Sequence, residues 1–544
     1  MNPMSPGERY WQRSLHDFAA MTAPGTPVRE GGATDPPRFA ARRGRAVRPL
    51  APVPRELGDL RSAFHHFRAA APERCPAPAE HGLDPARLSA LLHYTCGLVR
   101  TEFGPAARWP YHRTAPSARC FAPTELSCWL PGSAERPAGL YGYDPAHHRL
   151  YLTRPGDHAT LLGRALGADP EGALGVLLFS SVFRRTAFKY GSYAYRLCAQ
   201  ESGLAAGNAL LVAGVLGVQG QVHHQFLDGP LAELMDLDPS AESVMAAVVL
   251  RPWRGARRAP VRAGREATVV IEQAVDQPVD QPVDQPVDQP VEPADLTELL
   301  AVDAAGRLDR TSAFTRLPAV PSPPPTPPPP GADPPSELAA LLRRRSSGPP
   351  TFTPLRRTIP ARTPLRIARH VLDPHASDVV DDGSGPPVLC HFWSVDVDGL
   401  DAGAHRLEDG RLRFLGPVDA DSLARQAANV SFRTANGVFF LSAPKDDAQR
   451  LFGDRSFRIL HQEAGIVAQR ICVLSAAEGL AARIHNGYDA RLVARELRLP
   501  PGHEPLFQIV LGTPGPDPRY LMPIALPAGP AGTGTTLENR TDTR

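Results

Sequence analysis

The chain has 544 residues and a net charge of +2, so it is long enough for two to four domains and has no charge excess that would favour nucleic acid or an anionic membrane. Its seven cysteines are odd in number and lack CxxC spacing, which argues against a disulfide framework or a zinc site. There is no apolar run long enough to span a membrane and no apolar signal core at the start, so we expect a cytoplasmic protein.

The first part of the sequence predicts an arm followed by a folded domain. Residues 1–55 are rich in Pro, Arg and Gly and lack periodicity, which favours a flexible arm. A domain follows over residues 56–258, and its patterns predict helices over 84–99, 157–166 and 193–216, and strands over 125–131, 148–153 and 244–250. The last of these helices is apolar on nearly every face, which is typical of a central buried helix.

A linker and a second domain follow. Residues 259–335 contain four Val-Asp-Gln-Pro repeats and a run of prolines, which favours an extended linker with a short helical patch near 294–304. A second domain is predicted over 336–526, with strands over 388–394, 411–415 and 506–511 and a helix over 455–478. The small polar residues of 527–544 predict a disordered tail.

The two domains share a repeated segment. Residues 189–223 recur 262 positions later as residues 451–485 without a gap, and eight of the 35 pairs are identical where chance gives roughly two. We therefore predict two copies of one α+β unit, packed as a pseudo-twofold pair like the subunits of a homodimer. Lys189 and Tyr190, the groups best suited to proton transfer, are Leu451 and Phe452 in the second copy. This difference indicates chemistry in the first half and support in the second.

Three segments of the first half carry a resemblance to a known family. These are Arg113-Thr-Ala-Pro-Ser-Ala-Arg119 with the following Pro-Thr-Glu-Leu, the Gly-Leu-Tyr-Gly-Tyr-Asp-Pro hairpin at 139–145, and the Lys-Tyr-Gly block at 189–208. In this order they resemble the SagB-type dehydrogenases, FMN enzymes of the nitroreductase superfamily. The resemblance implies two tandem nitroreductase-like folds, an α+β class, in which an intramolecular pseudo-dimer or a homodimer builds the flavin site.

The resemblance also implies an activity. Members of this family oxidise thiazolines or oxazolines to thiazoles or oxazoles in ribosomally synthesised peptides, after a cyclodehydratase has closed the rings. The expected substrate is therefore a modified precursor peptide, and a cyclodehydratase is a further candidate partner. Two alternatives remain open. One is a flavin-dependent reductase of dehydroamino acids or of nitro or quinone substrates, and the other is a non-catalytic scaffold in a peptide-maturation complex.

The expected catalytic pair is Lys189 and Tyr190, which match the family's catalytic lysine and tyrosine. Removal of a ring proton requires a base, and a lysine serves only when desolvation or nearby cations lower its pKa. The alternative is an exposed lysine at a helix entry beside a core tyrosine. Adjacent histidines such as those at 223 and 224 point in divergent directions and lack a cysteine or carboxylate pattern, so we expect no metal site.

The expected flavin contacts come from several segments. Small residues of the loop would let backbone amides approach the flavin ring, and its arginines could pair with the phosphate or the pyrimidine edge. Arg119 stands where the family has glycine, and arginine tolerates a positive φ poorly. An arginine-rich opening at 343–347 matches the phosphate motif of nitroreductases, although a basic helix end would look the same. The expected FMN-binding residues are Arg113, Thr114, Pro116, Ser117, Ala118, Arg119, Arg196, Asn208, Arg344 and Ser346.

Overall fold

The computed structural model describes most of both predicted domains. The described residues are 4–17, 20–21, 36, 38–39, 46–67, 83–104, 107, 109–168, 172–253, 296–319, 336–381, 383–418 and 429–526. The predicted Val-Asp-Gln-Pro repeats and the predicted tail at 527–544 lie outside them. None of the described helices is both long and apolar enough to cross a membrane.

The first half is built on an eight-stranded sheet. Its strands lie in the order β1 (Ala46–Pro49), β6 (Arg149–Pro155), β5 (Gly139–Asp144), β4 (Thr124–Leu130), β7 (Gly175–Val182), β9 (Glu242–Pro252), β8 (Val218–His223) and β11 (Ala376–Ser377). All pairs are antiparallel except β8 with β11, a strand from the second half. The helices of this half are α3 (Leu60–Phe67), α4 (Pro85–Cys96), α5 (Ala159–Leu166), α6 (Arg184–Tyr190), α7 (Ala194–Val215) and α8 (Asp228–Met235).

The second half is built on a six-stranded sheet. Its order is β15 (Arg411–Gly416), β14 (Gly403–Glu408), β12 (Leu389–Ser394), β16 (Gly437–Pro444), β18 (His503–Gly512) and β17 (Ala481–Ile484). The helices are α10 (Leu338–Arg344), α11 (Arg362–Arg369), α13 (Lys445–Phe452), α14 (Ser456–Ala477) and α15 (Ala490–Glu496). Two small sheets complete the fold: β10 (Ile359–Pro360) with β13 (Val397–Asp398), and β19 (Tyr520–Pro523) with β2 (Leu98–Phe103) and β3 (Tyr111–Arg113).

The two large sheets have the same topology. Strands β6-β5-β4-β7-β9-β8 correspond in order to β15-β14-β12-β16-β18-β17. Helices α7 and α14 begin and end 262 residues apart, and the short helices η2 (Gly191–Tyr193) and η5 (Gly453–Arg455) precede them. Gly191 and Gly453 open these turns with φ values of 52° and 56°, a conformation that favours glycine. The predicted duplication of an α+β unit is confirmed.

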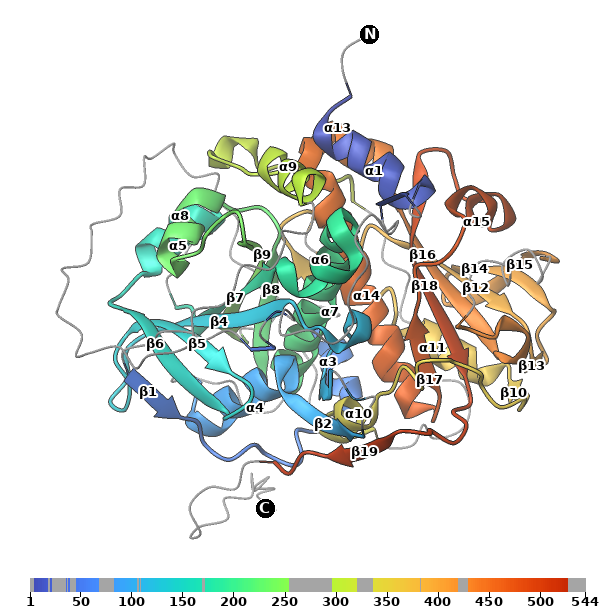
Figure 1. Cartoon of the computed structure of the whole chain (residues 1–544), viewed down its shortest axis with the longest axis horizontal. Coiled ribbons are helices and arrows are strands. Elements are labelled where there is room, and N and C mark those ends of the chain that lie inside the picture. The colour runs from blue at the N-terminus through green and yellow to red at the C-terminus, as the bar shows by residue number, and fades with distance from the viewer. Residues whose placement is uncertain are drawn as a thin grey trace, which may run out of the picture.

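The halves meet where α7 and α14 cross between the sheets (Figure 1). A Cβ on Gly203 would lie 2.4 Å from the carbonyl oxygen of Gln462, and one on Gly465 would lie 2.8 Å from that of Gln200. Glycine at both positions therefore permits the close approach of the two helices. The close packing of α7 against α14 explains why glycine occurs at both 203 and 465.

Buried arginines exchange hydrogen bonds across this interface. Arg196 donates to the carbonyl oxygen of Leu506 at 3.0 Å, and Arg458 donates to that of Val244 at 3.2 Å. The two bonds are related by the same 262-residue offset. This reciprocity is the mark of an isologous contact, here within one chain.

The prediction of a flexible arm over 1–55 is wrong for the described part of that range. Helix α1 (Pro6–His16) begins with Ser5 as its N-cap, buries Tyr10 and Trp11, and its Gly7 amide donates to Asp454 at 3.0 Å. In the predicted linker, α9 (Thr297–Ala305) lies beside α1 (Figure 1), and its Leu299 amide donates to Ser192, the counterpart of Asp454. The same kind of helix therefore precedes each half, and both helices belong to the folded core.

Candidate functional site

A cavity of about 700 Å³ lies between the two halves. The cavity adjoins β17, at an edge that is covered in the first sheet and, in the described part of the chain, uncovered in the second. In the first sheet, β11 covers the outer edge of β8; in the second, β17 ends the sheet among the described residues. In the first half, the short strand that precedes β4 along the chain is β3, and it pairs with β2. The space left beside β17 is lined from both halves, and its volume suits a ligand of cofactor size.

The loop after β3 forms one wall of the cavity and has an unusual backbone. Arg119, Cys120 and Ala122 have φ values of 51°, 61° and 49°, a region that costs a residue with a side chain about 1–2 kcal/mol. Arg119 thus adopts a positive φ at the position where the family has glycine. The Ala122 amide donates to the Ser117 hydroxyl at 2.9 Å and closes the loop. Strain of this kind gathers at functional sites.

Arg113 gives the strongest sign that this wall holds a ligand. Its Nη1 donates to the Thr124 carbonyl oxygen at 2.7 Å, and its Nε and Nη2 are buried without a partner in the described structure. The side chain lines the cavity with 7% of its residue surface exposed. Since a buried guanidinium is rarely left half satisfied, an acceptor is expected in the cavity.

Lys189 and Tyr190 both line the cavity at the end of α6. Gln200 and Glu201 of α7 line it from the adjoining helix, and Gln200 exchanges hydrogen bonds of 3.2 and 2.7 Å with Asn486 of the second half. Burial raises the pKa of Glu201, against the opposing effects of its contacts with Ser117 and Arg113. Gln200 and Glu201 therefore place polar groups in the cavity lining.

An arginine cluster, composed of Arg100, Arg345, Arg483 and Arg519, occupies another part of the lining. Arg345 follows α10 and is buried, with its Nε donating to the Thr114 carbonyl oxygen at 3.0 Å. Burial, then the neighbouring Arg345 and Arg519, lower the pKa of Arg100 to about 10. Ser346 and Ser347 line the cavity beside the cluster. Concentrated positive charge with hydroxyl donors is a phosphate-binding arrangement.

The cavity brings together most of the residues expected from the sequence. Its lining includes Arg113, Pro116, Ser117, Ala118, Arg119, Lys189, Tyr190 and Ser346. The FMN phosphate fits the arginine cluster, and the unpartnered atoms of Arg113 fit an acceptor on the ring system. The residues present therefore suit the flavin that the resemblance implies.

Four expected contacts lie outside the cavity lining. Thr114 donates to the Thr95 carbonyl oxygen at 2.9 Å, and Asn208 donates to the same oxygen at 3.3 Å. Arg344 donates from Nε to the Ala476 carbonyl oxygen at 3.1 Å. Arg196 is fully buried and joins α1, β18 and Tyr488. In this structure these four side chains connect elements of the fold, and the neighbouring Arg345 faces the cavity in place of Arg344.

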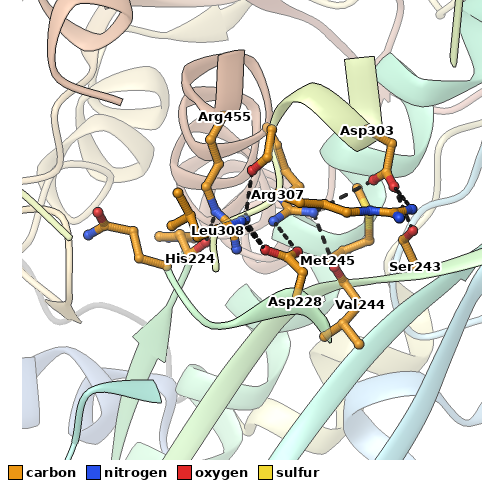
Figure 2. Close-up of polar contacts among 12 residues, drawn as sticks. His224, Asp228, Ser243, Val244, Met245, Asp303, Arg307, Leu308 and Arg455 are labelled. Atoms are coloured by element: carbon orange, nitrogen blue, oxygen red, sulfur yellow. Dashed lines mark hydrogen bonds and ion pairs between the residues drawn. The ribbon is translucent and has the colours of Figure 1, made fainter. Parts of the chain in front are cut away.

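The equivalent position on the other side of the pseudo-twofold axis is filled by side chains. Arg455 replaces Tyr193 and donates to the His224 carbonyl oxygen, Asp228 and the Gly306 carbonyl oxygen (Figure 2). Asp228 also accepts from the Leu308 amide at 2.8 Å, and Asp303 of α9 accepts from Ser243 at 2.7 Å. The segment after α9 is thus bound into this position.

A second buried group completes the filling. His224 lies 2.8 Å from Glu463, which also contacts His375 at 3.0 Å. Burial disfavours the charge on Glu463, but His375 and His224 hold its pKa well below the usual value. Asp378 accepts from the amides of His224 and Gln225 at 2.9 Å each. These groups contact one another and fill the position, which therefore resembles a core more than a binding site.

Comparison with known proteins supports the fold. Residues 389–513 match the model of the nitroreductase family. The chain contains a nitroreductase-family domain. Across the whole chain, the structure of a candidate nitroreductase from Anabaena variabilis aligns with 94% of this chain and 100% of its own, at 19% identity and a TM-score of 0.67. At that identity the likeness shows the fold, which is nitroreductase-like α+β.

Two smaller structures also align with parts of the chain. A candidate nitroreductase from Ralstonia eutropha covers 40% of this chain and 94% of its own, at 24% identity and a TM-score of 0.31. A chain of the E. coli microcin synthetase complex McbBCD, with truncated pro-MccB17 bound, covers 45% of this chain and 91% of its own, at 19% identity and a TM-score of 0.28. A search of curated proteins gave no match.

The family model matches the half in which Lys189 and Tyr190 are replaced. The match spans β12 to β18 and includes α14, the elements that build the sheet and the central helix. It therefore reports the nitroreductase-family fold in that half, whereas Leu451 and Phe452 still replace Lys189 and Tyr190 there.

Sequence reasoning missed several residues of the cavity. Arg100 lies on β2, Arg483 on β17 and Arg519 directly before β19, so their proximity depends on the tertiary fold. Arg345 lies within the arginine-rich opening at 343–347, one position after Arg344, which the sequence predicts to bind FMN. Glu201 was visible as an identity between the two copies, which is also the pattern of a structural residue.

Proposed function

We propose that the chain is an FMN-dependent dehydrogenase that oxidises thiazolines or oxazolines to the aromatic azoles in a modified precursor peptide. One observation carries this proposal: a single cavity collects the Arg113–Arg119 loop, the Lys189–Tyr190 pair and the Arg345–Ser347 segment from both halves. These are the segments that the resemblance to SagB-type dehydrogenases assigns to flavin, chemistry and phosphate. The filled position opposite it supports one flavin per chain.

The flavin would be held by residues of both halves. Arg345 and Arg100, with Ser346 and Ser347, would hold its phosphate, and Arg113 would donate to the ring system. When bound, FMN supplies an acceptor for the hydride that leaves the azoline ring. Because the ring must also lose a proton to become aromatic, a base is needed in the same cavity.

Lys189 and Tyr190 are the proposed proton-transfer groups. Both belong to the last turn of α6, whose C-cap Gly191 has a φ of 52° and turns the chain into α7. The pair is thereby fixed to the helix that also presents Gln200 and Glu201. Lys189 would take the proton from a ring carbon, and Tyr190 would donate a hydrogen bond to the ring or relay the proton that Lys189 has taken.

Lys189→Ala tests the assignment of the base. We expect the purified variant to keep its flavin absorbance near that of the unaltered protein. Its turnover of a synthetic thiazoline peptide, followed by mass spectrometry as loss of two hydrogens, should fall by about 10²–10⁴, the range for a general base. Leu451→Ala, at the equivalent position of the second half, is the matched control and should keep full turnover. Unchanged turnover in Lys189→Ala would remove the residue from the mechanism.

Cofactor analysis tests the proposal as a whole. Release of bound FMN at close to one per chain would support a single site built by two unlike halves. A colourless protein that does not take up FMN, but still binds precursor peptide, would favour the scaffold alternative. A flavoprotein that reduces dehydroamino acids or quinones and leaves azolines intact would favour the reductase alternative.

A further inference from the structure

Three aromatic side chains beside the proposed catalytic pair form a continuous cluster in the cavity lining. The ring centroids of Trp109 and Phe121 lie 4.8 Å apart, those of Phe121 and Phe188 lie 4.8 Å apart, and those of Trp109 and Phe188 lie 5.7 Å apart. We call these three residues the aromatic wall. Phe121 also approaches Tyr190, with the centroids 6.2 Å apart. The wall thus adjoins the residue proposed to act on the substrate.

The aromatic wall lies outside the two hydrophobic core clusters of the described residues, although Phe121 itself is buried, with 3% of its surface exposed. The two core clusters among the described residues include neither Trp109, Phe121 nor Phe188, whereas Tyr190 packs against the larger of them. Trp109 and Phe188 remain partly exposed, and all three residues line the cavity. Large apolar side chains that line a cavity and do not join the core are typical of ligand-binding sites.

The aromatic wall and the arginine cluster occupy different parts of the cavity. Arg345 donates to the carbonyl oxygen of Thr114 in the first-half loop, and Arg483 donates to carbonyl oxygens at 347–350 of the second half. Phe188, in contrast, immediately precedes Lys189 in α6. A group resting on the wall would therefore lie beside the proton-transfer pair, where the reacting part of a substrate must be.

We propose that the aromatic wall binds an aromatic side chain of the peptide substrate, carried by the residue next to the reacting azoline ring. This inference rests on the proposed function and adds a substrate preference to it. Stacked and edge-to-face aromatic pairs prefer centroid separations of 4.5–7 Å, the range already present within the wall. An aromatic ring would extend that pattern, whereas an aliphatic side chain would gain only from the burial of apolar surface.

The aromatic wall would also orient the substrate. The azoline ring is small, and its hydrogen-bonding groups alone would fix it poorly. A neighbouring aromatic ring held on the wall would anchor the peptide and place the azoline at Lys189 and Tyr190. Such anchoring is the same in the bound substrate and in the transition state, so its loss should appear mainly in KM.

The first experiment compares three synthetic thiazoline peptides that differ only in the residue next to the ring: phenylalanine, cyclohexylalanine or glycine. For the unaltered holoenzyme we expect kcat/KM with phenylalanine to exceed that with cyclohexylalanine by about five- to tenfold, as one aromatic contact would give, with most of the difference in KM. Phe188→Leu keeps an apolar side chain but no ring, and it should abolish the difference. Phe414→Leu, at an exposed aromatic residue on β15 outside the cavity lining, is the control and should preserve it.

A binding measurement separates this inference from the proposed reaction. N-Acetylphenylalanine amide should quench the tryptophan fluorescence of the holoenzyme at lower concentrations than N-acetylalanine amide, and Trp109→Phe should remove most of the quenching. If no azoline is oxidised but this binding is seen, the proposed reaction fails and the aromatic site stands. Equal kcat/KM for the phenylalanine and cyclohexylalanine peptides would overturn the inference. Loss of flavin from Phe188→Leu would also overturn it, because the wall would then support the cofactor.

Discussion

The crossing of α7 and α14 allows a stability prediction to be worked from distances. In Gly203→Ala, the added methyl group would lie 2.4 Å from the Gln462 carbonyl oxygen and 2.7 Å from the Gln462 Cα. Both atoms belong to the backbone of α14, so neither can move away alone. Alanine gains up to about 1 kcal/mol over glycine within a helix, whereas overpacking costs typically about 1–3 kcal/mol and occasionally more. We expect a net loss of about 2 kcal/mol in the free energy of unfolding.

Urea denaturation followed by circular dichroism measures this loss as a lower midpoint. Gly229→Ala is the matched control because a Cβ at that helical position has nothing within 4 Å. It should change the free energy by no more than about 1 kcal/mol. Since wider separation of α7 and α14 would also separate Gln200 from Asn486, Gly203→Ala should bind FMN more weakly. If both variants unfold at the same urea concentration, the account of the helix crossing is refuted.

Three further outcomes follow from the loop, the buried ion pairs and the second half. Arg119→Gly should raise the urea midpoint by the equivalent of up to about 1 kcal/mol by relieving a positive φ, whereas Arg119→Ala, which keeps its Cβ, should not. Burial would raise the pKa of Glu463, but His375 outweighs it and holds this pKa well below the usual value. The ionised Glu463 therefore stabilises the fold above pH 4.5, and this contribution is lost as the pH falls further. Glu463→Gln should lower the free energy of unfolding at pH 7 by about 3–5 kcal/mol, and its urea midpoint should fall less steeply than that of the unaltered protein at acid pH. The double variant Leu451→Lys with Phe452→Tyr should still release one FMN per chain, because the position beside it is filled; two would show that the position can open.

Local sequence patterns predicted the elements whose cause is local. The helix expected over 193–216 is α7 (Ala194–Val215), and the strand expected over 125–131 is β4 (Thr124–Leu130). Helix α1 shows where the same reasoning stops. Ser5 and Glu8 give it a start signal, and the Glu8 amide does donate to Ser5 at 3.2 Å. Its stability depends on Asp454 and the other residues of η5, which lie far away in sequence.

Some residues of the candidate site could be predicted from local motifs, and others are brought together only by the tertiary fold. The loop at 113–119 and the Lys189–Tyr190 pair could be found because each is a contiguous motif, and the cavity contains most of both. The arginine cluster could not be found, because its members come from four separate segments and arginine is common in this chain. The aromatic wall has the same limitation, since Trp109, Phe121 and Phe188 are close together only after β3, the loop and α6 have folded.

The comparison of the two copies also changes how their shared residues should be interpreted. Arg196, which is kept as Arg458 in the second copy, is among the residues that the family resemblance predicts to bind FMN. The structure shows that Arg196 and Arg458 make equivalent bonds across the interface, and that Gly203 and Gly465 let the same helices cross. These four shared residues serve what both halves have in common, which is the pseudo-twofold contact. The residues that differ between the copies, such as Lys189 and Leu451, are the ones that can distinguish an open cavity from a filled position.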